Sequence, residues 1–426
     1  MNNLQRVQPP VFPVEKVIIP EARSFILDNG VPAFLIKAGT EDIMRLEFTF
    51  KAGQVKEYLP LLASTTNMML SEGSQNYNSE EINRLLDFYG VFLNLSTAKD
   101  RSGIVLFFLN KHIKKALEFS KEILFRPVFP EEELISLMHK RLRWYLVKRE
   151  KVQNIAMDKF FESVFGNGHP YGYNVVETDF ENLTPAILKE FHTKYYTPDN
   201  MAVIISGKTD DKTTEHLNNY FGDINSEKTV KEDIGNNLTK EAKKKIHISK
   251  PETVQSSIKI GSSTINKRHP DYPGMKVLNC ILGGYFGSRL MKNIREEKSY
   301  TYGINSSVSS LDLTGYKMIS TEVSQKNCQK TIDEIYKEIR LLQSVPVMKE
   351  EMTIVRNYMS GEMLRMFDGP FALAESFKSV WEFGLDNNYY KQLAEKIKTI
   401  DPDEIIQLAR TYYNIDDLYE ITVGAK

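Results

Sequence analysis

The chain repeats itself at a distance of about half its length. The segments 183–208 and 400–426 each contain a Tyr-Tyr pair and a later glycine, and the two Tyr-Tyr pairs are 217 residues apart (412 − 195). The glycines, Gly207 and Gly424, have the same offset. Shorter matches at an offset of 216 join residues 121–123 with 337–339 and 161–165 with 377–381. A period this long predicts a duplicated domain rather than a solenoid of short repeats.

The repeat sets the expected domain organisation and fold. We predict an N-terminal domain over residues 1–208 and a C-terminal domain over 246–426, joined by a polar linker over 209–245. A long surface loop within one domain is the alternative for the linker. Strand-like alternation, as at 46–50 and 257–261, is interspersed with amphipathic helices without regular βαβ order. We therefore expect an α+β fold of two duplicated domains, each a mainly antiparallel or mixed sheet with helices packed on one face.

Composition excludes several classes of function. The 55 Lys and Arg residues nearly balance 56 Asp and Glu residues, so no basic field favours nucleic acid or an anionic membrane. Two cysteines are too few for a disulfide framework and fit a reducing compartment. The first residues lack a secretory pattern, and no apolar run approaches the roughly 20 residues of a membrane helix. We expect a cytoplasmic protein that binds neither nucleic acid nor membrane.

Common catalytic motifs are absent from the sequence. No two of the seven histidines have the i, i+4 spacing of HExxH or HxxEH, and there is no GxSxG, P-loop or GxGxxG fingerprint. The glycine-rich stretch 281–287 lacks the lysine and hydroxyl that would hold phosphates. Its glycines, including Gly283 and Gly284, would allow a tight turn or the close approach of a ligand.

Several segments together resemble one known family. The stretches 27–36 (LDNGVPAFLI), 165–173 (FGNGHPYGY), 183–207 and 283–304 resemble, in order and spacing, the pitrilysin-type (M16, inverted-zincin) peptidases. The resemblance covers almost the whole chain. It implies the two-domain fold of that family and, in active members, a zinc-dependent peptidase site built on an HxxEH helix.

This chain departs from the family at the zinc site. Counting back from Gly73-Ser74 places Ser64 and Met68 at the two histidine positions and Asn67 at the glutamate position, and Tyr145 (or Trp144) falls at the third-ligand position. These side chains do not make a catalytic zinc site, which needs three N, S or carboxylate ligands. The base that would activate zinc-bound water is also missing. We expect no metal in this chain and no peptide hydrolysis by the chain alone.

The family's second set of active-site residues is retained. In the resemblance, Arg295 and Tyr302 match an R-x6-Y segment that one unit presents to the zinc site of another. Tyr300 and Tyr302 would share a strand face over 299–304, with Arg295 on the preceding helical turn. Arginine can bind peptide carbonyls, and a tyrosine hydroxyl can stabilise an oxyanion. The alternative is a surface arginine and a core tyrosine. The resemblance also places Asn94 in an edge strand that pairs with an extended substrate. Gly283 and Gly284 are candidates for close approach to a substrate. Tyr300 is either a neighbour of the site that contacts substrate or a core residue.

The leading hypothesis is therefore a non-zinc-binding subunit of a heterodimeric M16-type zinc metallopeptidase. A partner chain with HxxEH would bind Zn²⁺, and Arg295 and Tyr302 would reach its bound peptide. Small peptides or unfolded polypeptides would be the substrates. The alternative hypothesis is a catalytically silent structural or peptide-binding scaffold subunit of the same fold.

Overall fold

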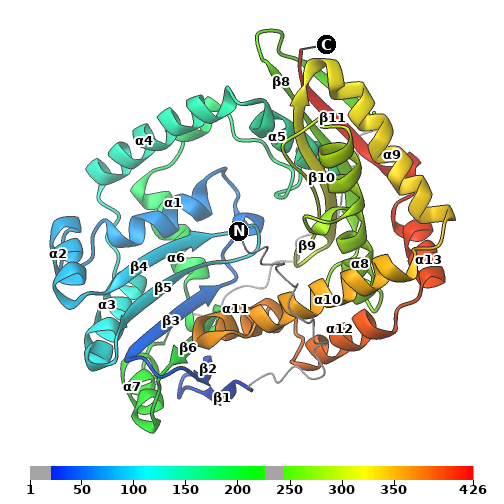
Figure 1. Ribbon diagram of the computed structural model, residues 1–426. Coiled ribbons are helices and arrows are strands. Elements are labelled where there is room, and N and C mark those ends of the chain that lie inside the picture. Colours follow the sequence, from blue (N-terminus) through cyan, green and yellow to red (C-terminus); the bar gives the residue numbers. More distant parts are fainter. Residues whose placement is uncertain (1–20, 226–242, 426) are drawn as a thin grey trace, which may run out of the picture.

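The computed structural model describes residues 21–225 and 243–425, which form two mixed β-sheets with matching strand orders (Figure 1). In the first sheet the order is β1(Arg23–Ile26), β2(Pro32–Lys37), β6(Met201–Gly207), β3(Ile43–Phe50), β5(Ser102–Leu109), β4(Phe92–Thr97). In the second it is β7(Lys245–Ser249), β11(Tyr419–Gly424), β8(Gln255–Thr264), β10(Gly315–Ser324), β9(Ile304–Ser310). The pairs β2–β6 and β7–β11 are parallel, and all others are antiparallel. Apart from β1, each strand of one sheet has a counterpart in the other, as a duplication predicts.

The repeated glycine has the same structural cause in both halves. Gly207 ends β6 with φ +130°, and Gly424 ends β11 with φ +151°, both in a region that favours glycine. A Cβ atom at Gly207 would lie 2.4 Å from the carbonyl oxygen of Ile43, and one at Gly424 would lie 2.5 Å from the hydroxyl of Ser256. Both strands therefore end where a side chain would not fit.

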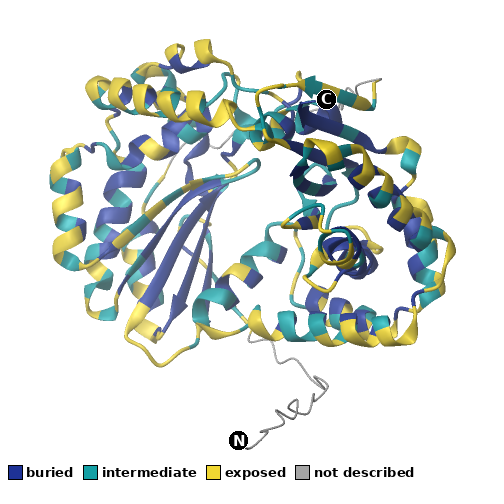
Figure 2. Cartoon of the chain, turned by 45° about the horizontal axis from the view of Figure 1, so that its top comes forward, coloured by how far each residue is buried: buried dark blue, intermediate teal, exposed yellow. Residues whose placement is uncertain are grey.

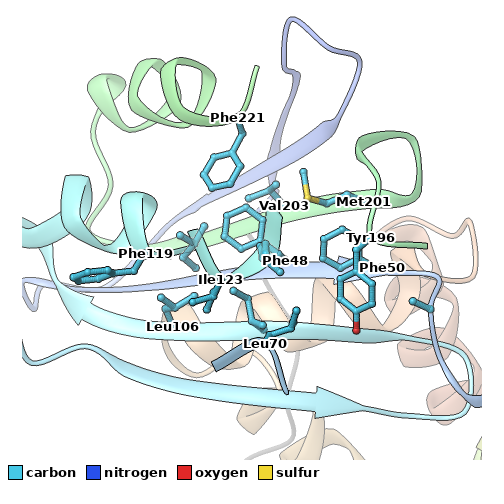
Figure 3. Packing of buried hydrophobic residues seen from close by; sticks show 14 of the residues in the cluster. Phe48, Phe50, Leu70, Leu106, Phe119, Ile123, Tyr196, Met201, Val203 and Phe221 are labelled. Atoms are coloured by element: carbon cyan, nitrogen blue, oxygen red, sulfur yellow. The ribbon is translucent and has the colours of Figure 1, made fainter. Parts of the chain in front are cut away.

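Helices cover the outer faces of the sheets. Local signals set several ends: Asn78 and Glu81 form a capping box at the start of α2, and Asp401 accepts the backbone N–H of Glu404 at the start of α13. Aromatic and aliphatic side chains from helices and strands meet in the first core (Figure 3), and Figure 2 shows the central strands buried and the outer helix faces exposed. The helices are α1(Leu62–Met68), α2(Ser79–Tyr89), α3(Ile113–Phe125), α4(Glu131–Arg149), α5(Val152–Phe165), α6(Pro185–Tyr195), α7(Asp211–Phe221), α8(Tyr272–Asn279), α9(Cys328–Ser344), α10(Lys349–Arg365), α11(Gly369–Trp381), α12(Asn388–Thr399) and α13(Pro402–Tyr412).

Each half also contributes one helix to the sheet of the other half. Helix α5 packs on β8 and β11, where Phe160 and Val164 join Ile421 and Val423 in one buried cluster. Helix α11 packs on β2 and β6, and its Leu373 lies in a cluster with strand residues of the first sheet. The α+β prediction is confirmed, with one addition. Each sheet's own helices cover one face, and a helix from the other half covers part of the second face.

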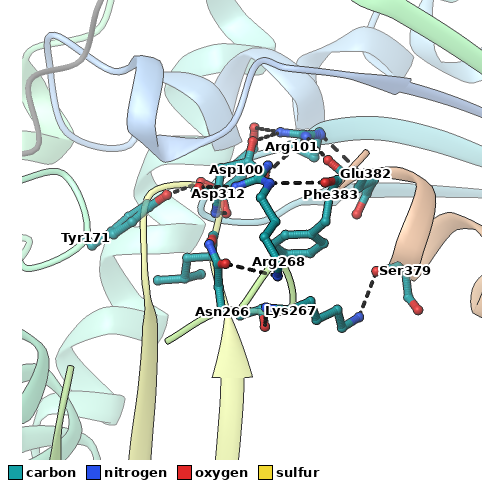
Figure 4. A network of polar contacts seen from close by, with 12 residues as sticks. Asp100, Arg101, Tyr171, Asn266, Lys267, Arg268, Asp312, Ser379, Glu382 and Phe383 are labelled. Carbon is teal, nitrogen blue, oxygen red and sulfur yellow. Dashed lines mark hydrogen bonds and ion pairs between the residues drawn. The ribbon is translucent and has the colours of Figure 1, made fainter. Parts of the chain in front are cut away.

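Charged residues join the two halves through a network of polar contacts (Figure 4). Arg101, which follows β4, forms an ion pair with Asp312 of the β9–β10 turn and donates to the carbonyl oxygen of Glu382 at 3.2 Å. The backbone N–H of Asp312 donates to the Asp100 carboxylate at 3.0 Å. Within the second half, Arg268 donates to the carbonyl oxygen of Asp312 at 2.7 Å and so supports the turn that Arg101 contacts. These contacts fix the relative position of the two sheets.

Two sequence-based expectations differ from the structure. The predicted linker 209–245 contains helix α7, whose Leu217 and Phe221 are buried in the first core, so this part belongs to the first unit. Residues 226–242 of that linker lie outside the described residues. The predicted strand over 299–304 is wrong, because Ser299 has φ +55° and β9 begins only at Ile304.

Candidate functional site

Helix α1 carries Ser64, Asn67 and Met68, which the sequence resemblance assigns to the family's zinc-binding helix, and a carboxylate holds its first turn. Leu61, just before the helix, has a left-handed conformation with φ +68°. The Glu57 carboxylate accepts a hydrogen bond from the backbone N–H of Ala63 at 2.8 Å. Burial raises the pKa of Glu57 to about 7, although hydrogen bonds from the backbone of Ala63 and Ser64 and the charges of Arg141 and Lys99 oppose the shift.

The guanidinium of Arg141, from α4, lies against the first turn of α1. It donates to the hydroxyl of Ser64 at 2.8 Å and also to the hydroxyl of Thr65. Burial lowers the pKa of Arg141, and the Glu57 carboxylate opposes that shift. The hydroxyl of Thr65 in turn points to the sulfur of Met138, 3.7 Å away. The positive charge of Arg141 thus lies beside Ser64, the residue assigned to the first histidine position. The sequence did not indicate Arg141, because the two residues come together only where α4 lies against α1.

Asn67, at the glutamate position, has a structural role. Its side chain is fully buried, and its amide donates to the carbonyl oxygen of Gly103 at 3.2 Å and to the hydroxyl of Tyr196 at 3.1 Å. In the second half, Asn279 of α8 is also buried and donates to the carbonyl oxygen of Ser306 at 3.0 Å. Both asparagines fasten a helix to the sheet beneath it, and neither can act as a base.

Met68 and Tyr145 lie apart from each other. Met68 is 39% exposed and lines a groove of about 380 Å³ together with Leu93, Leu95 and Leu137. The hydroxyl of Tyr145 donates to the carbonyl oxygen of Val175 at 2.9 Å, and its ring packs on Phe180. Tyr145 therefore points away from α1.

These residues do not fit a zinc ion. Zinc requires imidazole, thiolate or carboxylate ligands, and none of these three residues offers one. The Ser64 hydroxyl already binds the guanidinium of Arg141, Met68 has only a thioether, and the Tyr145 hydroxyl is hydrogen-bonded to Val175. Across residues 21–225 and 243–425, no three His, Cys, Asp or Glu side chains gather where they could hold a metal.

The outer edge of the first sheet is formed by β4, which carries Asn94. Within the described residues β4 pairs only with β5, so its other edge has unpaired backbone groups. Exposed residues alternate along it with partly buried ones, and Asn94 is among the exposed. An open edge of this kind can accept an extended peptide as an additional strand.

Tyr302 is exposed on the second half, and Arg295 is partly exposed. Arg295 lies on the π-helix η7(Met291–Glu297), and its guanidinium stacks on the ring of Phe286, with 4.4 Å between Cζ and the ring centroid. The Phe286 side chain is 61% exposed and that of Tyr302 is 94% exposed. The interpretation of Tyr302 as a core aromatic is therefore wrong. Phe286 is a neighbour that sequence reasoning missed, although it lies in the glycine-rich stretch.

The loop that carries Tyr302 is held by its neighbours. The hydroxyl of Thr301 donates to the carbonyl oxygen of Glu322 at 2.7 Å, and that of Thr321 donates to the carbonyl oxygen of Gly303 at 2.9 Å. The backbone N–H of Tyr300 donates to the carbonyl oxygen of Ile294 at 3.0 Å, which ties the loop to η7. Tyr302 is thus presented from a fixed backbone.

The remaining predicted contacts have different surroundings. Tyr300 is partly buried against the second core, so it does not share an exposed face with Tyr302. A Cβ atom at Gly283 would lie 2.8 Å from the backbone nitrogen of Ser306, so this buried glycine serves the packing of η6(Cys280–Gly284) on β9. Gly284 is exposed at the end of the same π-helix. Of these three residues, Gly284 is exposed, Tyr300 is partly buried and Gly283 is buried.

The fold and site define a class of protein: a duplicated α+β chain in which the positions expected to hold a metal carry no suitable ligands. Residues 182–359 match the family model described as the Peptidase M16 inactive domain. Solved structures with the same fold include the M16 inactive domain from Pseudomonas fluorescens, with a TM-score of 0.83 and 19% identity over 95% of this chain and 98% of that one. A protease from Helicobacter pylori has a TM-score of 0.84 and 16% identity over 96% and 100%.

Curated relatives agree with this family. The Helicobacter pylori non-peptidase homolog YmxG is 23% identical over 372 residues, which cover 86% of this chain and 84% of that protein. The Bacillus subtilis zinc protease YmxG, itself uncharacterized, is 23% identical over 305 residues, covering 70% and 72%. The chain is thus similar in sequence and fold to M16-type proteins, among them ones described as an inactive domain and as a non-peptidase homolog. Within the described residues, no helix is long and apolar enough to cross a membrane.

Proposed function

We propose that this chain is the non-zinc-binding subunit of a cytoplasmic heterodimeric M16-type peptidase. A partner chain carrying HxxEH would bind Zn²⁺ and supply the base. This chain would contribute Arg295 and Tyr302 to the partner's site, where peptides or unfolded polypeptides are cleaved. Alone, it would hydrolyse nothing.

The observation that carries this proposal is the exposure of Tyr302 on a loop held by hydrogen bonds. A tyrosine that is 94% exposed gains little from burial, whereas its loop is ordered by Thr301, Thr321 and the link to η7. Such an arrangement suits a hydroxyl that must meet an oxyanion formed outside this chain, because a donor fixed in advance need not reorganise during the reaction.

Arg295 supports the same proposal through its position on Phe286. The exposed ring limits the conformations of the guanidinium, so that its fixed donors are available to peptide carbonyls. The open edge of β4 favours a second candidate function, a peptide-binding scaffold without a catalytic contribution. In that second case Asn94 would lie beside the bound peptide.

The test is a peptidase assay on the complex of this chain with an HxxEH-carrying chain, using a quenched peptide. We expect Tyr302→Phe to lower kcat by about 100-fold, because one oxyanion donor is lost. The zinc content of the complex should stay the same. Tyr220→Phe on α7 removes the same single oxygen at a distant site and serves as the control. Unchanged turnover with Tyr302→Phe would favour the scaffold.

A further inference from the structure

A partly buried cation, Arg141, lies beside Ser64, which the resemblance aligns with the family's first zinc-binding histidine. Arg141 donates to two successive hydroxyls of α1, those of Ser64 and Thr65, and so joins the helix to α4. In a zinc site the metal makes a comparable link, since its ligands come from both helices. Two side-chain hydrogen bonds therefore link α1 to α4 without a metal.

Each of the two hydroxyls both accepts and donates a hydrogen bond in this arrangement. Ser64 accepts from Arg141 and donates to the carbonyl oxygen of Leu61 at 3.1 Å, while Thr65 accepts from Arg141 and donates to the sulfur of Met138. Arginine stays charged under ordinary conditions and offers several donors in fixed directions. The contact is thus directional, and the guanidinium that makes it keeps its charge over the ordinary pH range.

The surrounding charges are suited to a guanidinium. The Glu57 carboxylate, which holds the first turn of α1, provides the negative charge that faces Arg141, and Lys99 adds a further positive charge nearby. A divalent metal ion placed at Ser64 would be repelled by the adjacent guanidinium. Loss of the histidines is therefore not the only reason why this site binds no metal.

We infer that Arg141 replaces the metal ion: its guanidinium fastens α1 to α4 and keeps divalent cations from the degenerate zinc positions. The fold of this chain is consequently independent of zinc. The inference concerns the isolated chain, so it stands or falls separately from the proposed peptidase complex.

The first experiment restores two ligands and measures metal binding. Ser64→His and Met68→His together place two imidazoles at i, i+4 on α1, and Zn²⁺ affinity is measured by competition with a coloured chelator. We expect adding Arg141→Met to this pair to tighten Zn²⁺ binding about tenfold or more, because the repelling charge is gone. Adding Arg143→Met, on an exposed arginine of the same helix, should leave the affinity unchanged. Equal affinities with and without Arg141 would overturn the inference.

The second experiment measures hydrogen exchange at the amides of α1. In the unmodified protein a chelator should leave this exchange unchanged, whereas Arg141→Met should accelerate it about tenfold or more. Arg143→Met again serves as the control. If Arg141→Met does not fold, Arg141→Lys keeps the charge but loses the two-pronged contact, and it should still accelerate exchange. The inference is contradicted if a chelator accelerates exchange, or if the Arg141 variant behaves like the control.

Discussion

The guanidinium of Arg295 lies over the ring of Phe286, with 4.4 Å between Cζ and the ring centroid. The two residues belong to different segments: Phe286 follows the π-helix η6, and Arg295 lies within the π-helix η7. Stacking an arginine on an exposed aromatic ring stabilises the pair by about 0.5–1 kcal/mol and limits the directions in which the guanidinium can point. Phe286 is thus a positioning residue for the proposed substrate contact.

Phe286→Leu should weaken substrate binding by the proposed complex. Without the ring, Arg295 samples more conformations, so we expect KM to rise about fivefold while kcat changes less than about twofold. Steady-state kinetics on a quenched peptide measures both. Phe88→Leu, at an exposed phenylalanine of α2, is the matched control. A fall in kcat with unchanged KM would assign Phe286 a different role.

Asn67→Glu should destabilise the chain strongly, whereas Met68→His should not. Asn67 is fully buried, so a carboxylate there would lose the two hydrogen bonds of the amide and would lie near no metal. We expect a loss of about 3 kcal/mol in the free energy of unfolding. Met68 is 39% exposed, so its replacement should change that free energy by about 0.5 kcal/mol or less.

Urea unfolding followed by circular dichroism measures both variants. Equal effects of the two substitutions would show that the local environments of Asn67 and Met68 do not differ as described. A stable Asn67→Glu variant would also remove the structural explanation for the asparagine at that position.

His192 should make the protein less stable at acidic pH. Its Nε2–H donates to the carbonyl oxygen of Leu124 at 2.7 Å, and burial lowers its pKa from 6.5 to about 4. Between these two values the unfolded chain binds a proton that the folded chain does not, so stability falls as the pH drops from about 6.5 to about 4. The loss attributable to His192 between pH 7 and pH 4.5 should be about 2 kcal/mol.

The measurement compares the unmodified protein with His192→Gln by urea unfolding at both pH values. Glutamine can still donate to Leu124 but does not titrate, so the variant should lose about 2 kcal/mol less on acidification. Taking this difference removes the opposite trend from Glu57, whose raised pKa of about 7 favours the folded state at lower pH. His139→Gln, at an exposed histidine of α4, should behave like the unmodified protein. Parallel pH profiles for the unmodified protein and His192→Gln would contradict the prediction.

The sequence predicted those features that depend on residue type and local pattern. The duplication was visible because Gly207 and Gly424 occupy equivalent strand ends at which a side chain would collide with the neighbouring strand. The alternation of apolar and polar residues at 46–50 and 257–261 likewise predicted the strands β3 and β8. The strand expected over 299–304 failed because Ser299 turns the chain, and alternation of side chains does not reveal a single left-handed residue. The exchange of α5 and α11 between halves was not predictable, since periodicity shows that a helix has an apolar face but not which sheet it covers.

By itself, the sequence determined that the chain is a duplicated α+β protein and that its first helix offers no zinc ligands, because both follow from which residues stand at which spacing. Only the tertiary structure decided that Arg141 lies beside the expected metal positions and that Tyr302 faces the solvent. Arg141 and Ser64 are 77 residues apart, and their contact exists because α4 packs on α1. Tyr302 is exposed because the hydrogen bonds of its loop hold it away from the second core. Contacts between distant residues depend on how whole elements pack, which no local pattern specifies.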